Sequence, residues 1–445
     1  MTLPVTTTGD DVGPGPIDAA RPASRPLVPV RLGIYVDCRY EANGGELMAH
    51  RDAIGFLTFA REVGGHFSRV VHFGRAATDG GGVGTDGADE FVSLGPAELV
   101  MLPSYGSVRD LRRLAGAAGR TATAMWRGLD RVDAVWVFGP HPFAVLLAVL
   151  ALVRGRRLVL GVRQDTMAYF RARLPSPRWR PVLVPVAALD RAFRLLARFR
   201  PATVVGRPNV TAYGGPRPGL FDMTVALTRR SDIVPPRPGP LTAPIELLAV
   251  GRIDHEKNPL LLVDALADLE ADEPGRFRLT WIGTGPLAGA VAARAEARGV
   301  GGSVHLAGFV PFGPELLDRY RRADMFVHTS VTEGSPQVLF EAAAAGLPIV
   351  ATDVGGVAAA MGPAAELVPP ADLAALVAAV RRVTGDDECR RRREDAHRLA
   401  LATTLEGEAE RTAAFIAAAT THTDRPAAGV TAHPAGVAGT AGRQP

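Results

Sequence analysis

The chain alternates between short apolar segments rich in β-branched residues and longer segments with helical periodicity. In the first half the apolar segments are LGIYV, RVVHF, AVWVF, LVLGV and ATVVG, and in the second half they are IELLAVG, FRLTWIG, VHLAG, DMFVHTS, PIVATD and ELVPP. Such alternation is typical of parallel sheets with helices on both faces. The pattern predicts an α/β protein with two parallel-sheet domains that face each other across a cleft, and ligands of such sheets bind beyond the carboxyl ends of the strands.

A proline-rich break separates the two halves. The sequence DIVPPRPGP, residues 232–240, can continue neither a helix nor a central strand. A chain of 445 residues is also long enough for two hydrophobic cores. We expect a disordered N-terminal tail over residues 1–30, an N-terminal domain over 31–235, a C-terminal domain over 236–395, a last helix over 396–419 and a disordered tail over 420–445.

Composition argues against several classes of protein. The net charge is only +4, because 46 acidic residues nearly balance the basic ones, so nucleic-acid binding has little support. Cys38 and Cys389 match no zinc or redox spacing. The N-terminus lacks the features of a secretory signal, and the apolar run Phe143–Val153 is too short to span a bilayer and is interpreted as a buried helix. We expect a cytoplasmic protein.

The segment TEGSPQVLFEAAAAGLP, residues 332–348, contains the most residues that indicate a ligand-binding site. Ser335 is a favourable N-cap, and Pro336 suits the first helical position. Gly346 and Pro348 then end the helix. The sequence predicts a helix of about three turns that begins directly after a loop.

Two glutamates flank the start of this predicted helix. Glu333 lies in the loop, and Glu341 lies six positions past the predicted cap, roughly 9 Å along the helix axis. Carboxylates accept hydrogen bonds from sugar hydroxyls, and the free N–H groups of a first helical turn bind phosphate. The arrangement therefore fits a nucleotide-diphosphate sugar. The phosphate-binding positions are Gly334, Ser335, Gln337 and Val338.

The alternative is that these two glutamates are solvated surface residues. Glu341, however, stands among apolar residues, where an unpaired buried charge would be unfavourable. We therefore expect a polar partner for its carboxyl group.

Lys257 is the only lysine among the 50 lysine and arginine residues. It follows the segment IELLAVG in the loop GRIDHEKNP, which also contains Arg252. Fixed cations stabilise the charge that grows on a leaving diphosphate, and lysine offers a compact charge where arginine offers a planar fork. A solvated lysine paired with Asp254 or Glu256 is the alternative. The chain has no Asp-x-Asp triplet, so we expect these cations and the helix dipole, with no metal, to neutralise a diphosphate.

These motifs resemble family 4 of the retaining glycosyltransferases, which have the GT-B fold of two Rossmann-like domains. The resemblance rests on GRIDHEKNP, WIGTGP, VHLAGFV, ADMFVHTSVTEGSPQVLFEAAAAGLPIVATDVGG and LVPPADLAALVAAV, which cover most of residues 245–381. It implies that Arg252 and Lys257 bind the donor diphosphate, that Glu333 contacts the transferred sugar and that Glu341 contacts the ribose. It also implies retaining transfer from a nucleotide-diphosphate sugar, without a cofactor, to an acceptor that the sequence does not identify.

The resemblance is weaker in the first domain. In YEANGGELMAH, residues 40–50, Asn43, Gly44 and Gly45 resemble a glycine loop whose backbone approaches the donor phosphate, with a plain tight turn as the alternative. His141 follows the segment AVWVF. It is either an acceptor-side residue or the cap of the next helix.

Two positions depart from the family pattern. Arg163, Gln164 and Asp165 follow the segment LVLGV, where the family often has a histidine near the transferred sugar. Arg163 and Asp165 are acceptor-side candidates, and a structural ion pair between them is the alternative. Ala358 and Ala359 stand where the family tends to have Pro-Glu.

Three further interpretations remain open. The sequence GTGPLAG, residues 283–289, loosely matches a dinucleotide fingerprint but lacks the acidic residue that should follow, so an NAD-dependent oxidoreductase is a weak alternative. A non-catalytic nucleotide-sugar binding subunit is another. Residues 171–200 carry eight arginines with Trp179, Phe193 and Phe199, and this segment is either a helix at the inner membrane surface or a solvated helix. The oligomeric state is not indicated.

Overall fold

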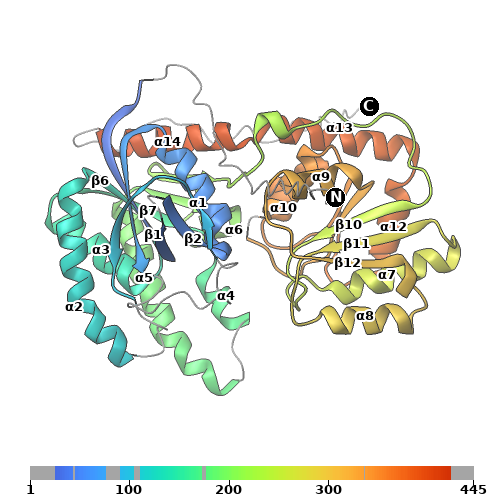
Figure 1. The fold of residues 1–445 in the computed structure, drawn as a ribbon, viewed down its shortest axis with the longest axis horizontal. Helices are drawn as coiled ribbons and strands as arrows, with labels where there is room; N and C mark the ends of the chain where they lie inside the picture. The colour runs from blue at the N-terminus through green and yellow to red at the C-terminus, as the bar shows by residue number, and fades with distance from the viewer. Residues whose placement is uncertain are drawn as a thin grey trace, which may run out of the picture.

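The computed structural model describes residues 26–43, 46–76, 91–104, 111–172, 177–334 and 336–421. These residues form two α/β domains that stand side by side (Figure 1). Most of the two predicted tails lies outside the described residues. The first strand begins at Val28 and the last helix ends at Thr421, so regular structure extends slightly beyond the predicted boundaries at residues 31 and 419.

The N-terminal domain contains a nine-stranded sheet. Its order is β4-β2-β1-β6-β7-β8-β9, with β3 paired to β1 and β5 paired to β3. All pairs are parallel except that β2 runs antiparallel to β1 and β4. The parallel sheet is confirmed, and the β1–β2 hairpin is an addition that the sequence pattern did not predict. The strands are β1 (Val28–Asn43), β2 (Glu46–His50), β3 (Phe67–Ala76), β4 (Phe91–Ser93), β5 (Glu98–Leu102), β6 (Ala134–Gly139), β7 (Arg157–Val162), β8 (Ala202–Val205) and β9 (Leu220–Met223).

Helices cover both faces of this sheet. In β6, Val135 and Val137 face one core, and Trp136 and Phe138 face the other, as the two-residue period of a strand requires. Both faces are buried, which is why AVWVF is an unbroken apolar run. One face packs against α2 (Leu111–Gly128), α3 (Pro142–Val153), α5 (Leu183–Phe199) and α6 (Arg207–Ala212), and the other against α1 (Arg51–Gly64). The short helix α4 (Thr166–Ala172) precedes α5.

The C-terminal domain contains a six-stranded parallel sheet of order β12-β11-β10-β13-β14-β15. Its strands are β10 (Ile245–Val250), β11 (Phe277–Ile282), β12 (Val304–Gly308), β13 (Met325–His328), β14 (Ile349–Thr352) and β15 (Ala365–Val368). Its helices are α7 (Pro259–Asp272), α8 (Ala288–Ala297), α9 (Pro314–Arg322), α10 (Gln337–Ala344), α11 (Val357–Met361) and α12 (Leu373–Val383). β10 and β13 are neighbours at the centre, so the loops that follow them meet at one edge of the sheet.

The prediction of one last helix over residues 396–419 is wrong. The structure has two helices, α13 (Asp386–Ala402) and α14 (Leu405–Thr421). Thr403 has non-helical backbone angles, φ −129° and ψ 67°. Thr404 Oγ1 accepts a hydrogen bond from the Gly407 N–H at 3.1 Å, which caps the new helix. Helix α14 packs into a core of the N-terminal domain (Figure 1), to which it contributes Leu405, Ala409, Ala413 and Ile416. The end of the chain therefore completes the first domain.

The chain crosses between the domains twice. The first crossing contains the predicted proline-rich break and connects β9 to β10, and the second is the break between α13 and α14. Helix α13 holds the first crossing in place: Arg393 donates hydrogen bonds to the carbonyl oxygens of Arg237 and Gly239, both at 2.9 Å. His397 Nδ1 lies 3.1 Å from the Val234 carbonyl oxygen. The two crossings thus run close together.

Candidate active site

Lys257 lies in the loop between β10 and α7, at the carboxyl edge of the C-terminal sheet. Asp254 organises this loop, because its Oδ1 accepts hydrogen bonds from the backbone N–H groups of Glu256 (3.0 Å) and Lys257 (3.1 Å). Thr329, just beyond β13, donates a hydrogen bond to the Lys257 carbonyl oxygen at 2.9 Å. The loop is therefore fixed at both ends, and the lysine side chain is largely buried.

Glu333 is the acidic partner of Lys257. Its Oε1 forms an ion pair with Lys257 Nζ and also accepts a hydrogen bond from Ser330 Oγ at 2.8 Å. His328 Nε2 lies 2.9 Å from the same oxygen. Burial alone would raise the pKa of Glu333, but the hydrogen bond from His328 and the charge of Lys257 outweigh burial and lower this pKa to about 2. Glu333 is therefore an ionised acceptor at neutral pH.

His328 and Ser330 are site residues that the sequence analysis missed. His328 is the last residue of β13 and is buried, and its Nδ1 has no hydrogen-bond partner among the described residues. Nε2 therefore carries the proton and donates it toward Glu333. Ser330 is also buried. Polar residues directly after an apolar strand, as in MFVHTS, were the available signal.

Glu341 lies in helix α10 and is almost completely buried. The polar partner that its apolar neighbours required is Tyr320 of α9, whose hydroxyl donates a hydrogen bond to Glu341 Oε2 at 2.7 Å. Burial raises the pKa of Glu341 to about 7, although the tyrosine hydrogen bond opposes this shift. Contact with a ribose stays a prediction for this residue.

Helix α10 begins one residue later than predicted. It spans Gln337–Ala344, and Pro336, not Ser335, is its N-cap residue. Pro336 has φ −78° and ψ 95°, an extended conformation that places it before the helix. Ser335 lies outside the described residues. Gly334 and Val338 are half-buried beside the helix start, and phosphate binding at this turn stays a prediction.

The N-terminal domain approaches this helix closely. A Cβ atom at Gly55 of α1 would lie 3.1 Å from Gln337 Oε1, and a Cβ atom at Gly206, after β8, would lie 3.0 Å from the Gly334 carbonyl oxygen. Both glycines permit a contact between the domains that a side chain would obstruct. The predicted donor-binding residues Gln337 and Gly334 therefore lie at the interface between the domains.

Arg252 does not take part in the ion pair between Lys257 and Glu333. Its half-exposed guanidinium pairs with Asp254 and Glu256 of its own loop, each at 2.9 Å. The pairing that the sequence analysis considered for Lys257 is thus made by Arg252. Diphosphate binding by Arg252 stays a prediction and requires it to leave these carboxylates.

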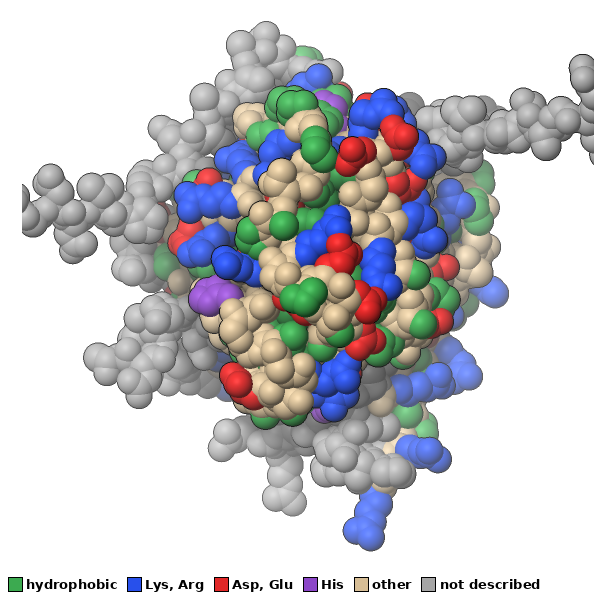
Figure 2. All heavy atoms as spheres, turned by 90° about the vertical axis from the view of Figure 1, so that its right-hand side faces the viewer, with side chains coloured by type: hydrophobic (Ala, Val, Ile, Leu, Met, Phe, Trp, Pro, Cys, Tyr) green, Lys and Arg blue, Asp and Glu red, His purple; other side chains and the backbone are tan. Residues whose placement is uncertain are grey.

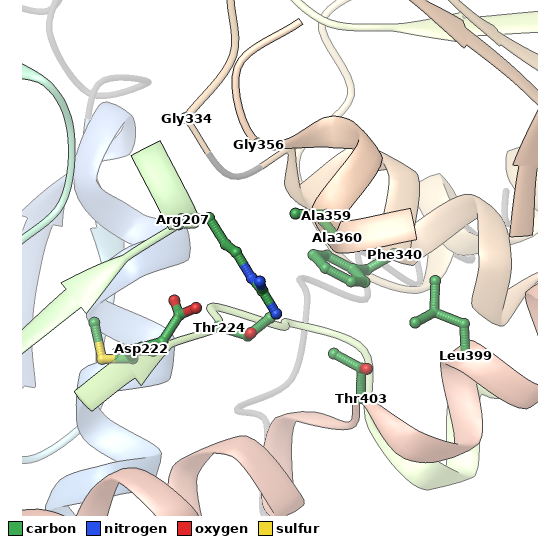
Figure 3. A pocket seen from close by; sticks show the side chains of 12 residues that line it. Arg207, Asp222, Thr224, Gly334, Phe340, Gly356, Ala359, Ala360, Leu399 and Thr403 are labelled. Carbon is green, nitrogen blue, oxygen red and sulfur yellow. The ribbon is translucent and has the colours of Figure 1, made fainter. Parts of the chain in front are cut away.

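A cavity of about 80 Å³ lies between the domains beside Gly334. Figure 3 shows the Arg207 side chain of the N-terminal domain extending into it, with Phe340 and Ala359 on the opposite wall. Its remaining lining residues are Gly206, Asp222, Met223, Thr224, Gly334, Gly356, Ala360, Leu399 and Thr403. Ala359 replaces the glutamate of the family pattern, so the wall here is apolar.

His141 caps helix α3. Its Nδ1 accepts a hydrogen bond from the Phe143 N–H at 3.3 Å, and its Nε2 lies 3.4 Å from Asp37 Oδ2. Asp37 in turn pairs with Arg75 at 2.9 Å. Burial lowers the pKa of His141 below its usual value, although Asp37 opposes this shift. The capping interpretation is confirmed, and an acceptor-side role stays a prediction.

The other candidates of the first domain are placed only in part. The guanidinium of Arg163 lies 4.2 Å from the centre of the Phe56 ring, a cation–π arrangement, and Asp165 is exposed before α4. Asn43 ends β1, but its side chain is outside what the structure describes, as are Gly44 and Gly45. The flanking strands β1 and β2 pair antiparallel, with Asn43 opposite Glu46.

The first two glycines of GTGPLAG pack against the lysine loop. A Cβ atom at Gly283 would lie 2.0 Å from the Gly251 carbonyl oxygen, and one at Gly285 would lie 2.3 Å from the Ile253 carbonyl oxygen. These contacts explain both glycines without a dinucleotide. Within the described ranges, no three His, Cys, Asp or Glu side chains gather as a metal site. No helix among those ranges is long and apolar enough to cross a membrane.

The fold defined by these two domains is that of the GT-B glycosyltransferases, as predicted. WaaG, a glycosyltransferase involved in lipopolysaccharide biosynthesis, is 18% identical with a TM-score of 0.60, over 86% of this chain and 99% of that chain. HepE of Anabaena, solved in complex with UDP and glucose, is 16% identical with a TM-score of 0.58, over 87% of this chain and all of that chain. At these identities the likeness shows the fold.

More specifically, residues 244–386 match the family model described as glycosyl transferases group 1. A glycogen synthase of Mycobacterium tuberculosis H37Rv is 35% identical over 176 residues, which are 39% of this chain and 42% of the relative. A D-inositol 3-phosphate glycosyltransferase of Geodermatophilus obscurus is 36% identical over 190 residues, which are 37% of this chain and 42% of the relative. The chain thus spans about two fifths of the length of these relatives. The family-model match over residues 244–386 contains both Lys257 and Glu333.

Proposed function

We propose that this protein is a glycosyltransferase that moves a sugar from a nucleotide-diphosphate donor to an acceptor. The proposal rests on the Lys257–Glu333 ion pair near the N-terminal end of helix α10, where the loops after β10 and β13 meet. A diphosphate placed here would meet a buried cation and the free N–H groups of a helix start. The sugar would meet an ionised carboxylate.

The chemistry follows from these charges. As the glycosidic bond breaks, negative charge grows on the leaving diphosphate, and Lys257 together with the helix dipole stabilises it. Side chains of the protein supply the positive charge that balances the diphosphate, which supports a metal-independent transfer. His328 and Ser330 hold Glu333 as an acceptor for sugar hydroxyls. We infer retention at the anomeric carbon from the family resemblance, with the leaving diphosphate taking the acceptor proton on the same face.

The donor can be tested without knowing the acceptor. Thermal-shift measurements with UDP, GDP, ADP and dTDP and their sugars identify the base, and release of free nucleotide, with water as a slow acceptor, measures bond cleavage. Proton NMR of the released sugar, taken before mutarotation, reports its configuration. Binding of a nucleotide without release from any of its sugars would instead support a non-catalytic binding subunit.

Substitution of Lys257 tests the proposed charge. We expect Lys257→Ala to fold normally and to lower nucleotide release by roughly 100- to 1,000-fold, the effect of removing one positioned donor at a developing charge. Lys257→Arg should recover little, because a planar fork cannot replace a compact charge paired with Glu333. Arg322→Ala, which removes an exposed cation of the same domain, is the control. Equal rates for Lys257→Ala and the control would contradict the proposal.

A further inference from the structure

Exposed apolar side chains concentrate on the helices that cover one face of the N-terminal sheet. Helices α2, α3 and α5 pack there side by side. Large apolar side chains are exposed on all three: Trp126, Val149, Val153, Val184, Leu195 and Phe199. These make up half of the twelve exposed large apolar residues in the described part of the chain, so the exposure is localised.

Helix α5 carries its exposed residues on one side. Val184, Arg191, Leu195 and Phe199 recur at helical spacing and are all exposed, with Val184 at 71% and Phe199 at 77%. The opposite side contributes Phe193, which is fully buried in the core. Phe193 therefore cannot belong to the surface that the sequence analysis expected over residues 171–200, whereas Phe199 can.

Two of the three arginines of this helix lack acidic partners among the described residues. Among the described residues Arg191 and Arg198 form no ion pair, and the only acidic residue of α5, Asp190, is buried and pairs with Arg194 at 2.7 Å. Helix α13 shows the opposite pattern, because four of its five arginines pair with acidic residues within the helix or on β15. Figure 2 shows the same mixture of basic and acidic side chains on the face of the C-terminal domain. Uncompensated positive charge is thus a feature of α5.

Helix α3 extends the apolar surface. The sequence analysis interpreted Phe143–Val153 as a buried helix, and this is only half correct. Phe143 and Leu147 are buried against the sheet, but Val149 and Val153 are exposed, Val153 at 70%. The helix has no charged residue between Pro142 and Val153. No described segment covers this side of α3.

We propose that the α3–α5 face, defined by Val149, Val153, Val184, Arg191, Leu195, Arg198 and Phe199, docks on the surface of a bilayer that contains anionic lipids. Unpaired arginines attract anionic headgroups, and the apolar side chains between them enter the boundary between headgroups and acyl chains. A nucleic acid would use the arginines but would leave the aliphatic side chains in water. The inference concerns a surface of the N-terminal domain, whereas Lys257 belongs to the C-terminal domain, and it does not depend on the proposed activity.

The position of α5 relates this surface to the candidate site. In Figure 1 one end of α5 extends below the rest of its domain. Helix α5 leads into β8, so its first residues lie on the side of the carboxyl ends of the strands. Val184 therefore lies toward that side, to which Gly206 and the interdomain cavity belong, whereas Phe199 and Val153, in the last turns of α5 and α3, lie toward the amino ends of the strands.

Vesicle sedimentation of the full chain tests the proposal. We expect the protein to pellet with phosphatidylcholine vesicles that contain phosphatidylglycerol and to remain in the supernatant with phosphatidylcholine alone. The double variant Leu195→Ser/Phe199→Ser should lower the partition coefficient about tenfold, because it removes apolar insertion. Arg191→Gln/Arg198→Gln should lower it about fivefold for each arginine, and added salt should weaken the binding of the parent protein.

Matched substitutions on the other domain serve as controls. Phe309→Ser removes an aromatic residue that is 54% exposed, and Arg322→Gln removes an exposed arginine. Neither should change sedimentation. Sedimentation that is independent of anionic lipid, or equally reduced by the controls, would overturn the proposal. The proposal would also be overturned if Leu195→Ser/Phe199→Ser sedimented like the parent and single-stranded RNA released both proteins from the vesicles. That result would identify a nucleic-acid surface. Nucleotide binding measured on the same samples keeps this result separate from the proposed activity.

Discussion

Two glutamates eight positions apart have opposite electrostatic environments. Glu333 is surrounded by groups that favour its charge, and its pKa is lowered to about 2 from 4.5. Glu341 is surrounded by apolar residues apart from Tyr320, and its pKa is raised to about 7 from 4.5. The folded state therefore stabilises the carboxylate of Glu333 and the protonated acid of Glu341.

These shifts predict opposite effects of pH on stability. Glu341 favours folding below pH 4.5, and this contribution is lost as the pH rises through 7. Relative to the parent, Glu341→Gln should therefore gain free energy of unfolding between pH 4.5 and pH 8, by about 3 kcal/mol. Urea unfolding at these two pH values measures the difference.

Glu333→Gln supplies the comparison of opposite sign. The carboxylate of Glu333 favours folding above pH 4.5, and this contribution is lost as the pH falls through 2. Glu333→Gln should thus destabilise the protein at pH 7, by about 3 kcal/mol at most, and less as the pH falls below 4.5. If both variants change stability in the same direction between acid and neutral pH, the two environments described for these residues are wrong.

At the scale of elements, the sheets and the Lys257 loop could be predicted from the sequence. Buried parallel strands are unbroken apolar runs, and polar residues after them mark the carboxyl edge. The break at Thr403 was missed, because alanine-rich sequence on both sides favours helix and one threonine cap is a weak signal. The contact between Tyr320 and Glu341 joins helices α9 and α10, and local sequence patterns do not specify such pairs.

The loop between β14 and α11 supports the loop of Glu333 through a glycine. Gly355 has φ +56°, and a Cβ atom there would lie 1.9 Å from the Glu333 carbonyl oxygen. Gly355→Ala should therefore displace the Glu333 loop. We expect nucleotide release to fall about 100-fold, the effect of misplacing a positioned group by about 1 Å.

Gly289→Ala is the matched control for this substitution. Gly289 lies in helix α8, and a Cβ atom there would have open space. This variant should keep its activity and gain about 0.5 to 1 kcal/mol of stability, because alanine favours helix over glycine. Full activity of Gly355→Ala would show that the two loops move independently.

At the scale of the whole molecule, the N-terminal domain depends on the last helix of the chain. Ile416 of α14 is fully buried in the same core as Trp136. Ile416→Asp places an unpaired carboxylate there and should destabilise this domain by roughly 3 to 5 kcal/mol. Hydrogen exchange should accelerate in β1 and β6 and remain slow in β10, which belongs to the other core.

Ala414→Asp provides the control within the same helix. Ala414 is exposed on α14, so the same new charge meets water and should leave exchange unchanged in both sheets. Acceleration in β10 equal to that in β1 would mean that the two domains unfold as one unit.

The double passage of the backbone from one domain to the other limits how they can move. A single flexible connection permits rotation about any direction, whereas two connections that lie close together resist twisting of one domain against the other. The remaining easy motion is bending about the line that joins the two connections. Such bending would separate Gly55 from Gln337 and Gly206 from Gly334, which would open a path for a bulky molecule to enter and leave.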